Sequence, residues 1–250
     1  MKQHTSVLML LSRSTIYPLL LRLIGMILVE CGLFYLVMQR KWSLVCEGKI
    51  ALEGLLSESG IYLVFLFVLF QTIGVLSEVG VEKGSKVGYT LRRLSVSEKT
   101  VVLWHWGYNS ICYLLLWWVQ ALTALGLCLW YVKAAPAEVV NHQTIMLACY
   151  RNMPLYLLFP LANVLGWMRN LSLVAALGLL TAKFPYLSRR GKNNSWYIVL
   201  LLVCCFPVNS SSPQADIMVI AAALLVCVVS AATLLRGEDI QDEELPEPEA

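Results

Sequence analysis

Apolar stretches of about twenty residues recur along this chain, and they restrict the kind of fold it can adopt. An α-helix rises 1.5 Å per residue, so about 20 mostly apolar residues cross the hydrocarbon core of a bilayer. Of the 250 residues, 58% are hydrophobic and only 14% are charged, and the mean hydropathy is +0.69. Soluble domains carry about 25% charged residues. The sequence therefore predicts an all-α, polytopic integral membrane protein.

Six stretches are predicted to span the membrane, within one transmembrane domain over residues 1–236. Their limits are 16–38, 60–77, 101–132, 161–182, 196–209 and 215–235. The first exceeds the 7–15 residues of a signal-peptide core, so it is predicted to remain as a span. Residues 151–160 (RNMPLYLLFP) are apolar but too short to cross, and they either lie on the surface or re-enter the membrane.

Charge is distributed unevenly along the chain. Residues 237–250 contain seven acidic residues, two prolines and no base, which predicts a disordered acidic tail. If the N-terminus is cytoplasmic, the inside segments hold twelve Lys and Arg residues and the outside segments hold five. The excess of bases inside predicts that both termini and the tail are cytoplasmic.

Ionisable groups inside predicted spans are the candidate functional residues, because each is costly in lipid. Glu30 lies near the middle of the first span, where it either faces a pathway or a partner helix or is hydrogen-bonded to a nearby Tyr or Asn. Arg22, nearer the cytoplasmic end, is interpreted as snorkelling to the interface. Arg169 faces a cavity, pairs with Glu30, or marks a misplaced span boundary.

His105 and Asn109 lie four residues apart in the third span and so share a helix face. They are expected to form hydrogen bonds between helices, with a proton relay as the alternative. Together with Glu30 and Arg169 they form the predicted intramembrane polar site.

Motifs for enzymatic chemistry are absent from the sequence. It contains no HExxH, no GxSxG and no Walker A pattern, and no histidine lies at metal-ligand spacing from a cysteine. The chain is therefore predicted to bind no metal and to have no ATPase or other catalytic activity of its own. Cys46 and Cys149 fall in predicted outside loops, where a disulfide between them is one alternative.

The segment that joins the second and third spans is basic and contains TLRRLSVS at residues 90–97. It is either an ordinary loop that binds anionic lipid or a docking element for a cytoplasmic partner. Two spans followed by such a segment and a third span resemble permease subunits of the type-2 ABC exporter superfamily. Residues 150–172 are similar to the proline-interrupted segment before the fourth span in small bacterial relatives. Ser95 stands where family members often have proline, and the aromatic third span has no family counterpart.

This resemblance implies an ABC exporter permease in a bacterial cytoplasmic membrane, paired in a homodimer or heterodimer and coupled to a separate ATPase subunit. ATP and Mg would bind the partner ATPase, this chain would hold no cofactor, and nucleic acid would not be a partner. The implied coupling segment is residues 89–98, with the docking residues Tyr89, Leu91, Arg92, Arg93, Leu94 and Glu98. The alternative is a non-transporting membrane scaffold, sensor or immunity-type protein.

Overall fold

The computed structural model describes residues 2–78, 98–136, 139–141, 143–161, 163–189 and 213–242. Every regular element in these ranges is a helix. The helices are α1 (Lys2–Arg40), α2 (Trp42–Cys46), α3 (Leu52–Glu58), α4 (Ile61–Glu78), α6 (Glu98–Ala134), α7 (Thr144–Arg151), α8 (Met153–Leu158), α9 (Val164–Arg189) and α11 (Pro213–Asp242). The all-α prediction is confirmed.

Five of the described helices are long and apolar enough to cross a membrane. These spans are Leu11–Arg40, Ile61–Glu78, Lys99–Ala134, Val164–Ser188 and Pro213–Leu234. They correspond to the first, second, third, fourth and sixth predicted spans. The predicted fifth span, at 196–209, lies outside the described residues.

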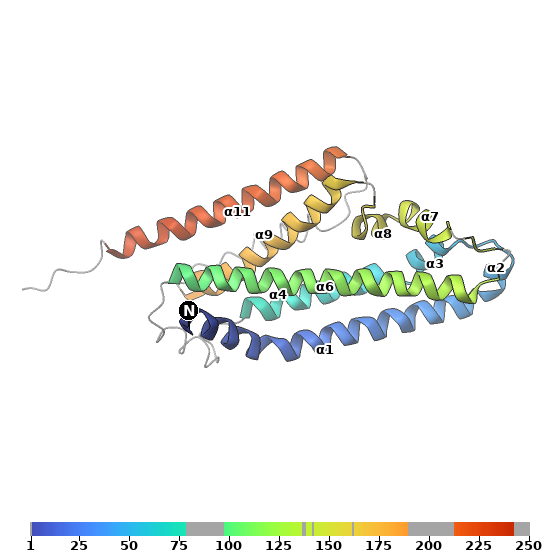
Figure 1. The fold of residues 1–250 in the computed structure, drawn as a ribbon, viewed down its shortest axis with the longest axis horizontal. Helices are drawn as coiled ribbons and strands as arrows, with labels where there is room; N and C mark the ends of the chain where they lie inside the picture. Colours follow the sequence, from blue (N-terminus) through green and yellow to red (C-terminus); the bar gives the residue numbers. More distant parts are fainter. Residues whose placement is uncertain are drawn as a thin grey trace, which may run out of the picture.

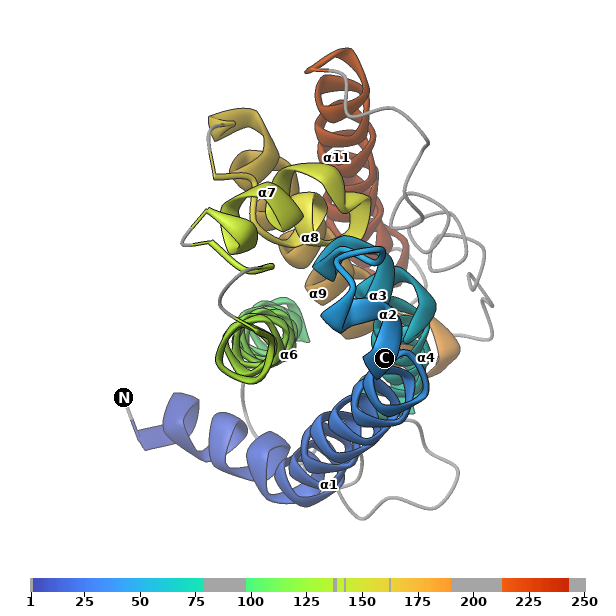
Figure 2. The same ribbon diagram turned by 90° about the vertical axis from the view of Figure 1, so that its right-hand side faces the viewer.

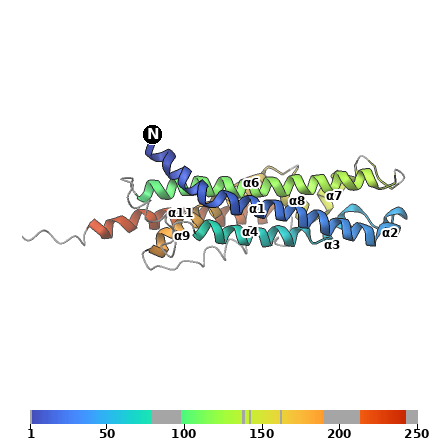
Figure 3. The same cartoon turned by 90° about the horizontal axis from the view of Figure 1, so that it is seen from below.

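The long helices run side by side along the length of the molecule, so their ends lie at two opposite ends of the bundle (Figures 1 and 3). The end that carries α2, α3, α7 and α8 is called the capped end here. The opposite end, called the terminal end, holds the start of α1, the start of α6 and the ends of α9 and α11. The segments that connect α1 to α4 and α6 to α9 therefore lie at the capped end.

Side-chain contacts fix the direction of each helix relative to its neighbour. Asn109 of α6 bonds to Thr181 late in α9, whereas Trp117 packs against Trp167 early in α9, so these two helices are antiparallel. In contrast, α9 and α11 are parallel, because their N-terminal parts and their later turns are each joined by polar contacts described below.

Two large apolar cores and a small third one at Val102, Ala182 and Tyr186 stabilise the described part of the bundle. The first lies among all five spans, and the second joins the capped-end halves of α1 and α6 to the short helices. α6 and α9 approach closely at Gly178, where an added Cβ would lie 2.2 Å from the Ser110 Oγ and 2.9 Å from the Ser110 backbone nitrogen. A small residue at this position is what allows two membrane helices to approach so closely.

The structure differs from the sequence prediction at two helix ends. The fourth span was expected to end at residue 182, but α9 continues to Arg189 with Lys183 inside it. Similarly, α11 continues to Asp242, so its last residues belong to the acidic segment predicted as disordered. No proline interrupts that segment before residue 246, and the helix can therefore continue from the apolar span.

Residues 151–160 do not form a span. α7 ends at Arg151, and Asn152 starts the short helix α8 by accepting a 3.1 Å hydrogen bond from the Leu155 backbone N–H. The Asn152 amide also donates to the Ser57 hydroxyl at 3.1 Å and to the Glu53 backbone carbonyl at 3.2 Å. These bonds hold α8 against α3 at the capped end.

Candidate functional site

A buried ion pair joins the N-terminal parts of α9 and α11. Arg169 lies in the second turn of α9, and its Nη1 donates to the Asp216 Oδ1 of α11 at 2.5 Å. The two side chains are 8% and 6% exposed, so the pair is almost completely removed from solvent. Arg169 thus pairs with Asp216 and not with Glu30, which corrects one of the three sequence-based alternatives.

Neighbouring groups complete the hydrogen bonding of this pair. Asn163 donates to the second Asp216 oxygen at 2.9 Å. The Arg169 Nη2 and the Asn170 amide both donate to the Leu157 carbonyl of α8, at 3.1 and 2.9 Å. We call Asn163, Arg169, Asn170, Asp216 and the Leu157 carbonyl the Arg169 network. Because each charge is hydrogen-bonded as well as paired, the network can be stable in a low-dielectric interior.

The sequence contained a signal for this network that the prediction did not use. In the predicted topology Arg169 lies early in the fourth span and Asp216 lies at the outer end of the sixth. They are opposite charges at the same end of two spans, which is the condition for a pair. What the sequence could not supply is that α9 and α11 are neighbours.

The polar face of α6 contacts α9. Asn109 is fully buried and donates to the Thr181 hydroxyl at 2.9 Å, and Thr181 in turn donates to the Leu177 carbonyl at 2.8 Å. One turn earlier, the His105 side chain is 6% exposed. The predicted hydrogen bond between helices is confirmed for Asn109, and the proton relay stays a prediction.

A second cation inside the bundle was not recognised from the sequence. Lys183, which the prediction assigned to a loop, is 2% exposed within α9 and donates to the Thr233 hydroxyl of α11. Thr233 itself donates to the Ser230 carbonyl at 3.0 Å. The lysine therefore joins the later turns of the same two helices that Arg169 joins at their start.

Glu30 occupies a fully buried position on α1 opposite α6. Its side chain is 0% exposed, and neither carboxyl oxygen has a hydrogen-bond partner of regular geometry among the described residues. The Gln120 amide of α6 is the side chain that approaches it, and the Gln120 Oε1 also lacks a partner in the described part of the chain. The predicted bond from Glu30 to a Tyr or Asn is not among the described contacts, whereas a polar group on a partner helix does face it.

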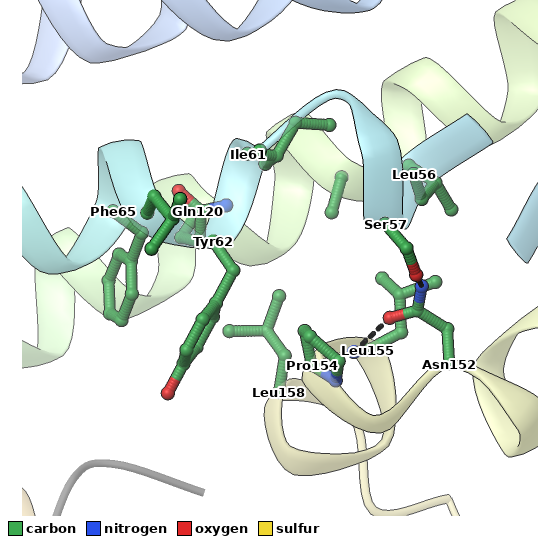
Figure 4. A pocket seen from close by; sticks show the side chains of 13 residues that line it. Leu56, Ser57, Ile61, Tyr62, Phe65, Gln120, Asn152, Pro154, Leu155 and Leu158 are labelled. Carbon is green, nitrogen blue, oxygen red and sulfur yellow. Dashed lines mark hydrogen bonds between the residues drawn. The ribbon is translucent and has the colours of Figure 1, made fainter. Parts of the chain in front are cut away.

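Gln120 is also part of the wall of a pocket at the capped end. The pocket has a volume of about 230 Å3 and lies among α3, the start of α4, α6 and α8. Figure 4 shows Tyr62, Phe65 and Leu158 on the apolar walls near Gln120, with Asn152 and Ser57 on the far side. Gln120 thus connects this pocket to the buried carboxyl group of Glu30.

The four residues of the predicted intramembrane site do not form one cluster. Asn109 bonds to α9, Arg169 belongs to the network with Asp216, and Glu30 faces Gln120. His105 lies one turn from Asn109 on α6. The polar groups are therefore distributed as separate contacts between pairs of helices.

Metal and thiol chemistry have little support in the described residues. These residues include no group of three His, Cys, Asp or Glu side chains placed to hold a metal. Cys46 and Cys149 are both free thiols, so the alternative of a disulfide between them is not what the structure contains. Burial raises the pKa of the Cys149 thiol, which leaves it less reactive than an exposed cysteine.

The predicted docking residues Tyr89, Leu91, Arg92, Arg93 and Leu94 lie outside the described residues. Glu98 is the first residue of α6, at the terminal end. Comparison of the chain with protein-family models, curated proteins and solved structures finds no match.

Proposed function

We propose that this protein is the membrane-spanning subunit of an ATP-driven ABC transporter, an exporter, that couples to a separate ATPase subunit through residues 79–97. The observation that carries the proposal is the position of the two helix ends that flank this segment. α4 ends at Glu78 and α6 begins at Glu98, and both helix ends lie at the terminal end. The joining segment holds four bases and one acid.

The charge distribution supports a cytoplasmic terminal end. Of the twelve Lys and Arg residues predicted inside, Lys183 is buried within α9, and the other eleven belong to segments at or beside helix ends at the terminal end; the segments with five border helix ends at the capped end. The excess of bases favours the cytoplasm for the terminal end. A cytoplasmic ATPase would then meet residues 79–97 together with the chain that follows α9.

The contact between Gln120 and Glu30 supports a transport role over a purely structural one. A fully buried carboxyl group whose oxygens lack a hydrogen bond of regular geometry among the described residues destabilises a fold, which favours a role other than packing. Gln120 lies between this group and the capped-end pocket. In the proposed transporter, Glu30 and Gln120 contact the substrate or a coupled proton during the switch of access.

The decisive experiment measures ATP hydrolysis by an ATPase with a Walker A motif that is encoded beside this gene and purified together with the chain in nanodiscs. The double variant Arg92→Glu, Arg93→Glu is expected to lower substrate-stimulated hydrolysis at least about tenfold, because charge reversal at the docking surface opposes association. The matched control is Arg40→Glu, Lys133→Glu, which makes the same change in net charge at two exposed positions at the capped end.

Equal hydrolysis by the docking variant and its control would show that residues 79–97 do not couple to the ATPase. If no ATPase copurifies and no hydrolysis depends on this chain, the scaffold, sensor or immunity-type alternative holds. A turnover that needs no ATPase and is lost in Glu30→Gln would instead identify an intramembrane enzyme.

A further inference from the structure

A groove runs along the surface of the bundle between α1 and α4. Its volume is about 660 Å3, and its walls are mostly apolar side chains, including Phe67, which is 62% exposed. Arg22 and Gln71 are the polar members of the wall, one from each helix. Pro18 borders the groove, and α1 bends in its N-terminal part (Figure 2), as expected where a proline removes a backbone donor.

Arg22 is a half-buried cation without a carboxylate partner among the described residues. Its Nη1 donates a 3.3 Å hydrogen bond to the Pro18 carbonyl in the same helix. It lies six residues after residue 16, where the first span is predicted to begin, which is about 9 Å along the helix. A guanidinium at this depth requires an anion or a route to the interface.

Within the described spans, this chain cannot supply that anion. The only carboxyl groups there are Glu30, Asp216 and Glu78. Glu30 is fully buried, Asp216 is paired with Arg169, and Glu78 is the last residue of α4. A second copy would bring the same three groups, so charge complementarity favours a different occupant.

We propose that the groove between α1 and α4 binds an anionic phospholipid, with its phosphate on Arg22 and one acyl chain along the apolar wall. The groove extends from Pro18 to Val29 on α1, about 16 Å, which is close to half of the roughly 30 Å hydrocarbon thickness. Arg22 lies in the half of the groove nearer the terminal end, so a lipid of that leaflet would point its acyl chain toward the membrane centre. Gln71 adds an amide donor on the opposite wall.

Gly25 gives this site a specific test, because it lines the groove without a side chain. A Cβ built at Gly25 meets nothing within 4 Å, so Gly25→Leu should occupy the groove without disturbing the helices. Gly32, also on α1, likewise has nothing within 4 Å but does not line the groove. Gly32→Leu is therefore the matched control.

The experiment is native mass spectrometry of the full-length protein in dodecylmaltoside with dioleoylphosphatidylglycerol or dioleoylphosphatidylcholine added. The wild type is expected to retain one phosphatidylglycerol per chain and to bind phosphatidylcholine about tenfold more weakly, which corresponds to about 1.4 kcal/mol. Arg22→Gln and Gly25→Leu should each weaken phosphatidylglycerol retention about tenfold, because they remove a charge-assisted bond and the groove volume respectively. Arg22→Lys and Gly32→Leu should retain it.

Two results would overturn the proposal. One is equal retention of the two lipids by the wild type, and the other is unchanged phosphatidylglycerol retention in Gly25→Leu. If the dimer fraction of Gly25→Leu also falls in the second case, the groove is an interface between copies. If Arg22→Gln does not fold, the comparison of Gly25→Leu with Gly32→Leu still decides.

Discussion

Breaking the Arg169 network from one side should destabilise the protein strongly, whereas removing both charges should not. Arg169→Met leaves the Asp216 carboxylate buried with the Asn163 amide as its one side-chain partner among the described residues. Removing one member of a buried ion pair typically costs about 3–5 kcal/mol. Because Asn163 still donates at 2.9 Å and Asn170 still satisfies the Leu157 carbonyl, we expect the lower value, about 3 kcal/mol.

The double variant Arg169→Met, Asp216→Leu distinguishes the net contribution of the ion pair to stability from the cost of leaving one charge buried and unpaired. Replacing a buried ion pair by apolar side chains is often neutral or stabilising. We therefore expect the double variant to lie within about 1 kcal/mol of the wild type, and well above either single variant. In a double-mutant cycle, a free-energy change for the double variant that differs strongly from the sum of the two single variants indicates that the two groups contact each other.

Thermal unfolding in detergent micelles, followed by tryptophan fluorescence, measures these differences. For a chain of 250 residues, 1 kcal/mol corresponds to about 2–4 °C, so each single variant should lower Tm by about 6–12 °C. Arg40→Met, at an exposed position, is the control and should change stability by less than about 0.5 kcal/mol. Single variants that match this control, or a double variant as unstable as the sum of the singles, would refute the buried pair.

Three further predictions concern other sites. Gly178→Val should destabilise by about 1–3 kcal/mol through overpacking against α6, whereas Gly126→Ala, with nothing within 4 Å, should not; equal Tm values would contradict the close approach. A membrane-impermeant maleimide added outside cells should label the exposed Cys46 rapidly and Cys149 slowly. Burial raises the pKa of the Cys149 thiol and so leaves less thiolate at neutral pH. Labelling of Cys46 only after lysis would reverse the proposed orientation. Glu30→Leu should leave Tm equal or higher, since it removes a buried carboxyl group that has no hydrogen bond of regular geometry among the described residues; a large loss of stability would show that Glu30 serves the fold.

The spans were predictable because their length and apolar content are local properties of the sequence. The start of each described span lies within five residues of the predicted limit, as in Val164 against residue 161. The end of α9 was missed because Lys183 was interpreted as the start of a basic loop. A lysine is tolerated there because the Thr233 hydroxyl of the neighbouring helix accepts its hydrogen bond, and which helices are neighbours is not a local property.

The polar site was less predictable for the same reason. Glu30, Asn109 and Arg169 were correctly singled out as costly groups inside spans, since that cost depends only on residue type and depth. Their partners Gln120, Thr181 and Asp216 lie 47 to 90 residues away in sequence. Helix adjacency and rotation determine these partners, and one sequence does not encode either in a readable pattern.

The parallel direction of α9 and α11 bears directly on the number of crossings. Arg169 pairs with Asp216 at the start of the two helices, and Lys183 bonds to Thr233 near their ends, so the chain enters both helices at the capped end. α1 begins at the terminal end, and α11 finishes there. A chain that begins and ends on one side of a bilayer crosses it an even number of times, whereas the described residues hold five spans. The crossing predicted at 196–209, outside the described residues, would raise the number of crossings to six. An even number is what a cytoplasmic location of both termini requires.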